Sequence, residues 1–201
     1  ADYTVTMGAL KTSLLSDYAK DIVGEITVCD LGLSYEKYTD GFDPVGYLLD
    51  PDDFCPPIRK SKSSNKGDYG HLAVISGEFS GASVIAANAA LRLGAGLVSI
   101  VSKERVEGGM CVMNKSTFPK GANAVAVGQG LGDEYEFDEI AAALSGRGVV
   151  LDADLFKKSY IKDLLKLCPK AVLTPHPKEF SSLLSQTLGL DVGAGEIQSD
   201  R

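Results

Sequence analysis

The hydrophobic pattern of this chain becomes regular after Lys66. From there on, short apolar runs that end on glycine or a polar residue alternate with longer segments of helical periodicity. The first cycle predicts a strand over 71–76, a loop over 77–81, an alanine-rich helix over 82–93 and a strand over 97–101. A strand, a helix and a strand in this order indicate two parallel strands joined by a right-handed crossover.

The same alternation continues toward the C-terminus. The later elements share these signals, and we expect strands over 122–127, 148–151 and 171–174, with helices over 139–144, 160–167 and 178–188. Short, nearly all-apolar strands that alternate with helices are typical of a parallel sheet covered on both faces. The predicted fold class is therefore α/β, with a mostly parallel sheet and helices on both faces.

The N-terminal residues have a different pattern. Strand-like runs over 5–7 and 24–30 are too few to build an independent core. We therefore interpret residues 1–33 as the tail of a second α/β domain. Residues 34–58 are rich in proline and acidic residues and are interpreted as a linker with a short helical turn near Pro51. The main domain is expected over 59–201.

Composition narrows the class of function. The net charge of −7 argues against a general nucleic-acid binder or a binder of anionic membranes, which need a basic face. The sequence has no apolar run long enough to cross a bilayer and no signal-peptide pattern. The four cysteines are widely spaced, which favours reduced thiols in a cytoplasmic protein over a zinc site or a disulfide framework.

Residues with unusual chemistry follow four of the predicted strands. They lie in the segments 77–82, 128–132, 152–154 and 174–179. In an open parallel sheet, ligands bind outside the carboxyl ends of the strands. We therefore expect these segments to form one site for a small, phosphate-bearing molecule.

Each of these segments also has a structural interpretation. Gly130 and Gly132 either form a tight turn or let the backbone approach a ligand closely. Asp152 and Asp154 are either helix N-caps or carboxylates that face a phosphate-bound magnesium ion or a hydroxyl group. His176 lies between two prolines that restrict its backbone, and we interpret it as a ligand contact.

Other residues are weaker candidates. Lys66 is a candidate cation for a phosphate, although an exposed lysine before a strand is usually only solvated. His71 is interpreted as structural, and Met110 and Met113 as core or cover residues. The sequence contains neither a G-x-S-x-G elbow nor a Walker motif, so no nucleophile or phosphate loop of those classes is indicated.

Several segments occur in the order found in the ADP/ATP-dependent NAD(P)H-hydrate dehydratases, which belong to the ribokinase-like superfamily. The segments that carry the resemblance are KGDYGH at 66–71, GA at 81–82, AALRLGAGLV at 89–98, VGQGLG at 127–132, LDAD at 151–154 and LTPHPKEF at 173–180. The resemblance covers roughly residues 59–201. Residues 1–33, with TVTMGALK at 4–11, resemble the end of the NAD(P)H-hydrate epimerase domain that precedes the dehydratase in bifunctional members.

This resemblance implies a metabolite-repair lyase that restores hydrated NADH or NADPH with consumption of ADP or ATP. The implied chemistry is phosphoryl transfer to the hydrate hydroxyl and then loss of phosphate, with Mg²⁺ neutralising the charge. The fused epimerase would add isomerase activity and a K⁺ site. The residues implied at the hydrated nucleotide are Ala82, Gly130, Gly132, His176 and Glu179, with Asp152 and Asp154 lining the same cleft.

Two features depart from the family pattern. Gln129 stands where the family usually has proline, in a loop that works through its backbone. The family's G-T-G-D segment, with its catalytic aspartate, is not found before Arg201. We therefore expect no catalytic residue and no metal ligand within the chain, and no turnover by the chain alone. We also expect Ala1 to be a processed or truncated start, with the epimerase's own site residues ahead of it.

Two other functions stay open. A ribokinase-like kinase for a pyrimidine, thiazole or sugar would make a stable phosphorylated product. A non-catalytic, nucleotide-binding half would need a partner chain. Because the edge of a parallel sheet normally continues into further structure, we expect a homo-oligomer.

Overall fold

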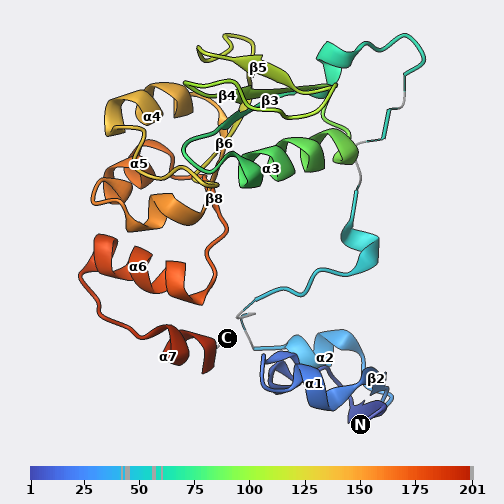
Figure 1. Cartoon of the computed structure of the whole chain (residues 1–201). Helices are drawn as coiled ribbons and strands as arrows, with labels where there is room; N and C mark the ends of the chain where they lie inside the picture. The colour runs from blue at the N-terminus through green and yellow to red at the C-terminus, as the bar shows by residue number, and fades with distance from the viewer. Residues whose placement is uncertain (42, 44–45, 56–57, 60, 200–201) are drawn as a thin grey trace. The chain divides into compact units, whose positions relative to one another are not determined.

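The chain folds into two compact units, which are described separately. The computed structural model describes residues 1–41, 43, 46–55, 58–59 and 61–199 (Figure 1). The smaller unit comprises Ala1–Cys55 with Gly195–Arg201, and the larger comprises Pro56–Ala194. Among the described residues, none of the helices is both long and apolar enough to cross a membrane.

The smaller unit contains two parallel strands. β1 and β2 pair in register from Tyr3 with Glu25 to Met7 with Cys29, which confirms both predicted strands. The elements are β1 (Tyr3–Met7), η1 (Thr12–Leu15), α1 (Lys20–Val23), β2 (Glu25–Cys29), α2 (Tyr35–Thr39) and η2 (Pro51–Asp53). The predicted helical turn is η2, which Asp50 caps through its side chain. η1, α1 and α2 were not predicted.

The larger unit is built on a six-stranded parallel sheet. The strand order is β5-β4-β3-β6-β7-β8, with β3 and β6 at the centre. The strands are β3 (His71–Ile75), β4 (Leu97–Val101), β5 (Met113–Lys115), β6 (Ala124–Val127), β7 (Gly148–Leu151) and β8 (Val172–Leu173). The helices are η3 (Lys66–Tyr69), α3 (Ser80–Leu93), α4 (Phe137–Leu144), η4 (Ala153–Lys157), α5 (Ile161–Leu167) and α6 (Pro177–Leu188). α7 (Ala194–Ser199) begins at the last residue of this unit and otherwise belongs to the smaller one. η3, η4 and α7 were not predicted.

Both faces of the sheet carry helices, as predicted. Successive residues of a strand point to opposite faces, so β3 contributes Val74 to one core cluster and Ile75 to another. The Val74 cluster includes Ala87 of α3, and Figure 1 shows α3 running along β3 and β4. The Ile75 cluster contains side chains of α4, α5 and α6. The fold class is therefore confirmed.

β5 was not predicted, because it has only three residues and lies at the edge of the sheet. Met113 begins this strand and is half-buried. The interpretation of Met110 as a core or cover residue is wrong, since its side chain is fully exposed. An edge strand needs little apolar sequence because it has a neighbouring strand on one side only and is open to solvent on the other.

Candidate functional site

The loops that follow β3 and β6 pack together at backbone distance. Phe79 donates its N–H to the carbonyl oxygen of Gly130 over 2.9 Å. Gly130 has φ +64°, and a Cβ at this position would lie 2.1 Å from the carbonyl oxygen of Phe79. A Cβ at Gly77 would likewise lie 2.0 Å from the carbonyl oxygen of Leu131. Only glycine allows these contacts, which fix the start of α3 beside the β6 loop.

A buried polar cluster ties the same loops to α3. The hydroxyl of Ser83 lies 2.8 Å from Ser76 Oγ and 3.1 Å from the carbonyl oxygen of Gln129. All three residues are buried, and Gln129 Oε1 has no hydrogen-bond partner among the described residues. The cluster holds the first turn of α3, where Ala82 is exposed, at the carboxyl edge of the sheet.

The loop after β7 contacts the β6 loop. The carboxylate of Asp154 accepts the N–H of Gly132 over 3.1 Å and lies 3.2 Å from Lys157 Nζ. Between the two aspartates, Ala153 has φ +43°. This left-handed conformation costs a non-glycine residue about 1–2 kcal/mol. Such strain tends to gather at functional sites.

The ends of β7 and β8 are also linked. Thr174 Oγ1 donates a hydrogen bond to Asp152 Oδ1 over 2.8 Å. Asp152 occupies the N-cap position of η4, yet its side chain accepts no hydrogen bond from the backbone N–H groups of that helix, all of whose residues are described. The N-cap interpretation therefore does not hold for Asp152, whose carboxylate faces the β8 loop instead.

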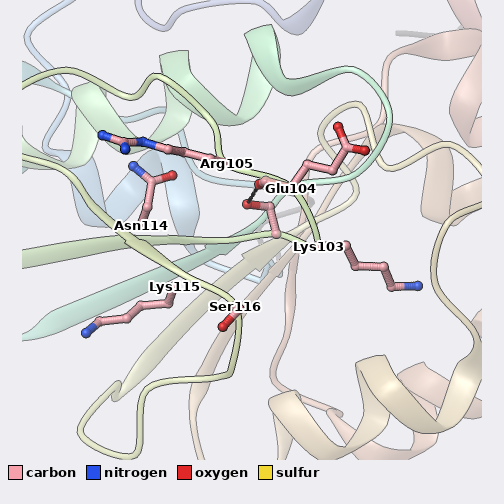
Figure 2. A pocket seen from close by; sticks show the side chains of 7 residues that line it. Lys103, Glu104, Arg105, Asn114, Lys115 and Ser116 are labelled. Carbon is pink, nitrogen blue, oxygen red and sulfur yellow. Dashed lines mark hydrogen bonds between the residues drawn. The ribbon is translucent and has the colours of Figure 1, made fainter.

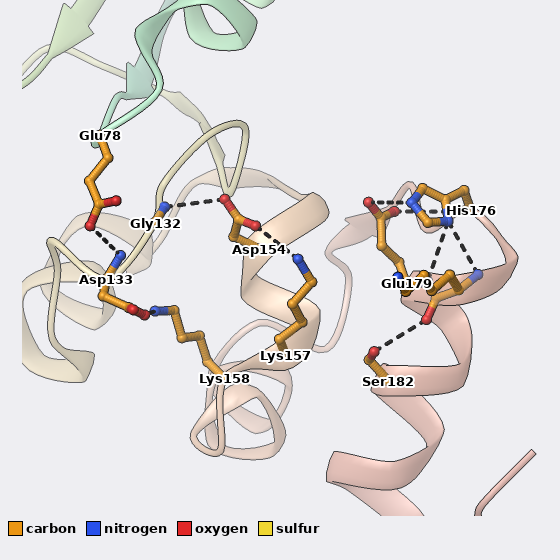
Figure 3. A network of polar contacts seen from close by, with 10 residues as sticks. Glu78, Gly132, Asp133, Asp154, Lys157, Lys158, His176, Glu179 and Ser182 are labelled. Carbon is orange, nitrogen blue, oxygen red and sulfur yellow. Dashed lines mark hydrogen bonds and ion pairs between the residues drawn. The ribbon is translucent and has the colours of Figure 1, made fainter. Parts of the chain in front are cut away.

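His176 is the N-cap of α6 and forms a reciprocal pair with Glu179 (Figure 3). Its Nδ1 accepts the N–H groups of Lys178 at 3.2 Å and Glu179 at 3.4 Å. Its Nε2 lies 3.0 Å from Glu179 Oε1. Nδ1 is therefore the acceptor and the ring proton sits on Nε2. The imidazole is 58% exposed, so much of the ring is accessible to a ligand.

Lys66 lies at the amino ends of the strands, opposite the carboxyl edge. It begins η3, ahead of β3, and its carbonyl oxygen would be 1.7 Å from a Cβ at Gly96. The five residues of β3 separate this end from the carboxyl edge. At about 3.3 Å per residue this amounts to about 16 Å. The structure therefore does not bring Lys66 together with the other predicted residues.

Several hollows lined by described residues lie along the carboxyl edge. One of about 390 Å³ lies where β4 and β5 end, and Figure 2 shows its side chains. There Asn114 Oδ1 accepts the N–H of Val106 over 3.1 Å. A second, of about 500 Å³, shares the segment 102–105 with the first and reaches Glu78. The third, of about 300 Å³, extends from Glu78 to Lys158. Together they flank the tips of β4, β3, β6 and β7.

Tyr135 braces this edge from the β6–α4 connection. Its hydroxyl donates to the carbonyl oxygen of Ser76 over 3.1 Å, and Lys103 Nζ lies 4.7 Å from the centre of its ring. Burial, followed by the negative charges of Glu134 and Glu139, raises the pKa of Tyr135 to about 12. The phenol is therefore a neutral hydrogen-bond donor at ordinary pH.

The described residues contain no group of three or more His, Cys, Asp or Glu side chains arranged to hold a metal ion. The four cysteines are unpaired. What the site offers is a set of backbone N–H groups, ammonium groups and carboxylates around glycine loops. Such a set can bind a phosphorylated molecule through its oxygens.

Comparison with known proteins fits this geometry. The family model described as NAD(P)H-hydrate dehydratase matches residues 72–201. This chain belongs to the NAD(P)H-hydrate dehydratase family.

The curated relatives of this dehydratase-family chain are longer than the chain itself. It is 39% identical over 216 residues to the bifunctional NAD(P)H-hydrate repair enzyme of Helicobacter pylori, a match that covers all of this chain and 42% of the relative. It is 32% identical over 223 residues to the enzyme of the same name from Coxiella burnetii, covering all of this chain and 43% of that protein. The chain thus spans less than half the length of these relatives.

Solved structures share the fold of this dehydratase-family chain. The ADP/ATP-dependent NAD(P)H-hydrate dehydratase of Bacillus subtilis, co-crystallised with ATP/Mg²⁺, matches with a TM-score of 0.50 and 24% identity, over 70% of this chain and 54% of that one. A hypothetical protein from Streptococcus mutans matches with a TM-score of 0.50 and 22% identity, over 68% of this chain and 56% of that one.

Within this dehydratase-family chain, the structure brings most of the predicted site residues to one edge of the sheet. They follow β3, β6, β7 and β8, and are Ala82, Gly130, Gly132, Asp152, Asp154, His176 and Glu179. The third hollow is also lined by Glu78, which lies in the predicted segment 77–82 but was not singled out, and by Asp133, Lys157 and Lys158, which were not predicted. Charged residues in loops are usually only solvated, so no local signal distinguished these four.

Proposed function

We propose that this chain takes part in the repair of hydrated NADH and NADPH by nucleotide-dependent dehydration. The observation that supports it most is the family match over residues 72–201, whose loops meet at one sheet edge. In the proposed reaction the hydrate hydroxyl oxygen attacks the terminal phosphorus of ADP or ATP and loses its proton to solvent. The bond from phosphorus to the nucleotide oxygen breaks, and AMP or ADP leaves. Phosphate then leaves the ring carbon as a neighbouring proton is lost, which restores the double bond.

We assign the substrate contacts to the carboxyl edge. Gly130 and Gly132 would approach the hydrated nucleotide through their backbone, beside the exposed Ala82 on the first turn of α3. The exposed imidazole of His176 would contact the substrate, while Glu179 holds the ring in position through its Nε2. Orientation of a histidine by a carboxylate fixes which nitrogen carries the proton.

We further propose that Mg²⁺ enters with the phosphates of ADP or ATP. Mg²⁺ is usually held by one or two carboxylates together with substrate phosphates and water. Asp152, whose carboxylate accepts a hydrogen bond from Thr174, is the candidate carboxylate for this role, and Asp154 would become a second one once its carboxylate leaves the N–H of Gly132. When bound, Mg²⁺ would neutralise charge on the transferred phosphoryl group.

Residues 1–33 are proposed to belong to an epimerase-like domain, followed by a linker over 34–58, with the dehydratase domain over 59–201. In β1, Tyr3 is 70% exposed, Val5 61% and Met7 56%. Parallel strands are normally buried on both faces, so these apolar side chains fit a larger sheet in the whole protein. The isomerase activity and its K⁺ site would belong to that domain. The unpaired cysteines support a cytoplasmic location.

The test uses the protein in the full length that its gene encodes. Hydrated NADPH is mixed with Mg²⁺ and either ADP or ATP, and the near-ultraviolet absorbance of the reduced ring is followed together with phosphate release. Recovery of absorbance only when nucleotide is present is the expected result. A stable phosphorylated product without recovery would instead support a ribokinase-like kinase. Binding of nucleotide without any product would support a non-catalytic half.

A further inference from the structure

The hollow of about 300 Å³ beside β6 and β7 is lined by charged side chains from three different loops (Figure 3). Glu78 comes from the loop after β3, Asp133 from the loop after β6, and Asp154, Lys157 and Lys158 from the segment after β7. Three carboxylates and two ammonium groups therefore meet over one glycine loop.

Two successive backbone N–H groups face this hollow, and a carboxylate from another loop accepts each of them. Gly132 donates to Asp154 Oδ2 over 3.1 Å, and Asp133 donates to Glu78 Oε1 over 3.0 Å. Gly132 has φ +60°. Successive N–H groups around a left-handed residue form a concavity that binds anions. In this structure the two carboxylates supply the anionic oxygens.

The two ammonium groups are neutralised in the same way. Lys157 Nζ lies 3.2 Å from Asp154 Oδ1, and Lys158 contacts the carboxylate of Asp133. The side chain of Lys158 is only 16% exposed, whereas that of Asp133 is 95% exposed. A shielded cation is therefore paired with a carboxylate that can return to water at little cost.

We propose that this hollow binds a diphosphate group, and that Glu78 and Asp154 occupy the positions of its oxygens until it arrives. The diphosphate oxygens would accept the N–H groups of Gly132 and Asp133 and pair with Lys157 and Lys158. The exposed Glu78 side chain would turn into solvent. This proposal rests on the proposed function, because both the dinucleotide substrate and ADP carry a diphosphate group.

The charges predict an unusual signature. With Glu78, Asp133 and Asp154 against two lysines, the hollow has a formal charge of −1, so its own carboxylates compete with an incoming anion. Removing the charge of Glu78 should therefore strengthen anion binding, while removing either lysine charge should weaken it. A network with a merely structural role would not bind an anion more tightly after loss of Glu78.

The test is calorimetric titration of the full-length protein with inorganic diphosphate, with NADPH and with ADP. Glu78→Gln keeps an oxygen for the N–H of Asp133 and should bind diphosphate about fivefold more tightly, the effect of one unit charge a few ångströms away in water. Lys158→Gln should bind it about tenfold more weakly. Lys162→Gln, on an exposed position of α5, is the matched control and should not change binding.

The three titrations show which ligand supplies the diphosphate group, and they test this site separately from the proposed function. A lysine-dependent affinity for NADPH alone assigns the hollow to the dinucleotide, and one for ADP alone assigns it to the nucleotide. Equal diphosphate binding by wild type, Glu78→Gln and Lys158→Gln would overturn the site even if the hydrate is repaired. Lysine-dependent binding without any repair would sustain the site and overturn the proposed function. Lys158→Arg keeps the charge and should restore binding if Lys158→Gln folds poorly.

Discussion

Glu179 accepts the backbone N–H of His176 over 2.9 Å and presents its other oxygen to Nε2 of the same residue at 3.0 Å (Figure 3). The pair closes the first turn of α6 and at the same time fixes the direction of the imidazole. His176 is thus both a helix cap and a proposed substrate contact. The two roles require different atoms, so substitutions can separate them.

His176→Asn should preserve α6 and impair substrate binding. Asparagine is a preferred N-cap residue, whereas alanine cannot accept the N–H groups of Lys178 and Glu179. We expect His176→Ala to lower the free energy of unfolding by about 1 kcal/mol, and His176→Asn to leave it nearly unchanged. Denaturant unfolding and the KM for hydrated NADPH are the measurements. An unchanged KM in His176→Asn would confine this histidine to the cap.

Gly130→Ala should destabilise the fold more than Gly146→Ala. Gly130 and Gly146 have nearly the same φ, +64° and +71°, so the backbone strain of alanine is alike at both. Only Gly130 is confined, by the carbonyl oxygen of Phe79, while the space around Gly146 is open. We expect about 1 kcal/mol for Gly146→Ala from strain and about 1–3 kcal/mol more for Gly130→Ala from crowding. Equal losses in denaturant unfolding would contradict the close contact of the two loops.

The raised pKa of Tyr135 should lower the free energy of unfolding at high pH. Its pKa rises from 10.0 to about 12 on folding, so between these values the unfolded chain has lost a proton that the folded chain keeps. Stability is therefore complete below pH 10 and falls as the pH rises toward 12. Unfolding midpoints at several alkaline pH values should show this fall. Tyr135→Phe cannot ionise at this position, and a wild-type slope in that variant would refute the assignment.

Lys115 should add to burial in lowering the pKa of His71. Burial first, and then the charge of Lys115, lower the pKa of His71 below 6.5, while Ser99 Oγ lies 2.8 Å from its Nε2. His71 thus contributes stability above pH 6.5 that is lost as the pH falls through its lower folded pKa. In Lys115→Gln the pKa of His71 should rise toward its ordinary value in an NMR titration. Lys120→Gln is the control, and an equal rise there would remove the specific role of Lys115.

The strands and helices of the larger unit were predictable because their signals are local. The run 71–75 is a nearly continuous apolar segment followed by a glycine loop, and the alanine-rich helix ends at Gly94 with a left-handed cap. The elements that were not predicted are short, and β5 and α2 among them also have little apolar sequence. The fold class followed from the alternation of elements, but the strand order did not.

The site was predictable only in its outline. Parallel strands place their ends at one edge, so Gly130, Asp154 and His176 could be grouped without coordinates. Which groups touch could not be known. Histidine is not a preferred N-cap, so the hydrogen bonds that its Nδ1 accepts at the start of α6 could not be expected from the residue type. Glu78 and Asp133 are distant in sequence, and only the packing of two loops brings the carboxylate of Glu78 to the N–H of Asp133.

The amino-acid sequence by itself determined the alternating elements, the glycine loops and the family, because periodicity and turn chemistry act over a few neighbouring residues. The tertiary structure alone decided that β3 lies between β4 and β6, that Lys66 is at the far edge, and that Glu78 and Asp154 cap one loop. These relations depend on backbone contacts between distant segments. No local pattern of side chains encodes such contacts.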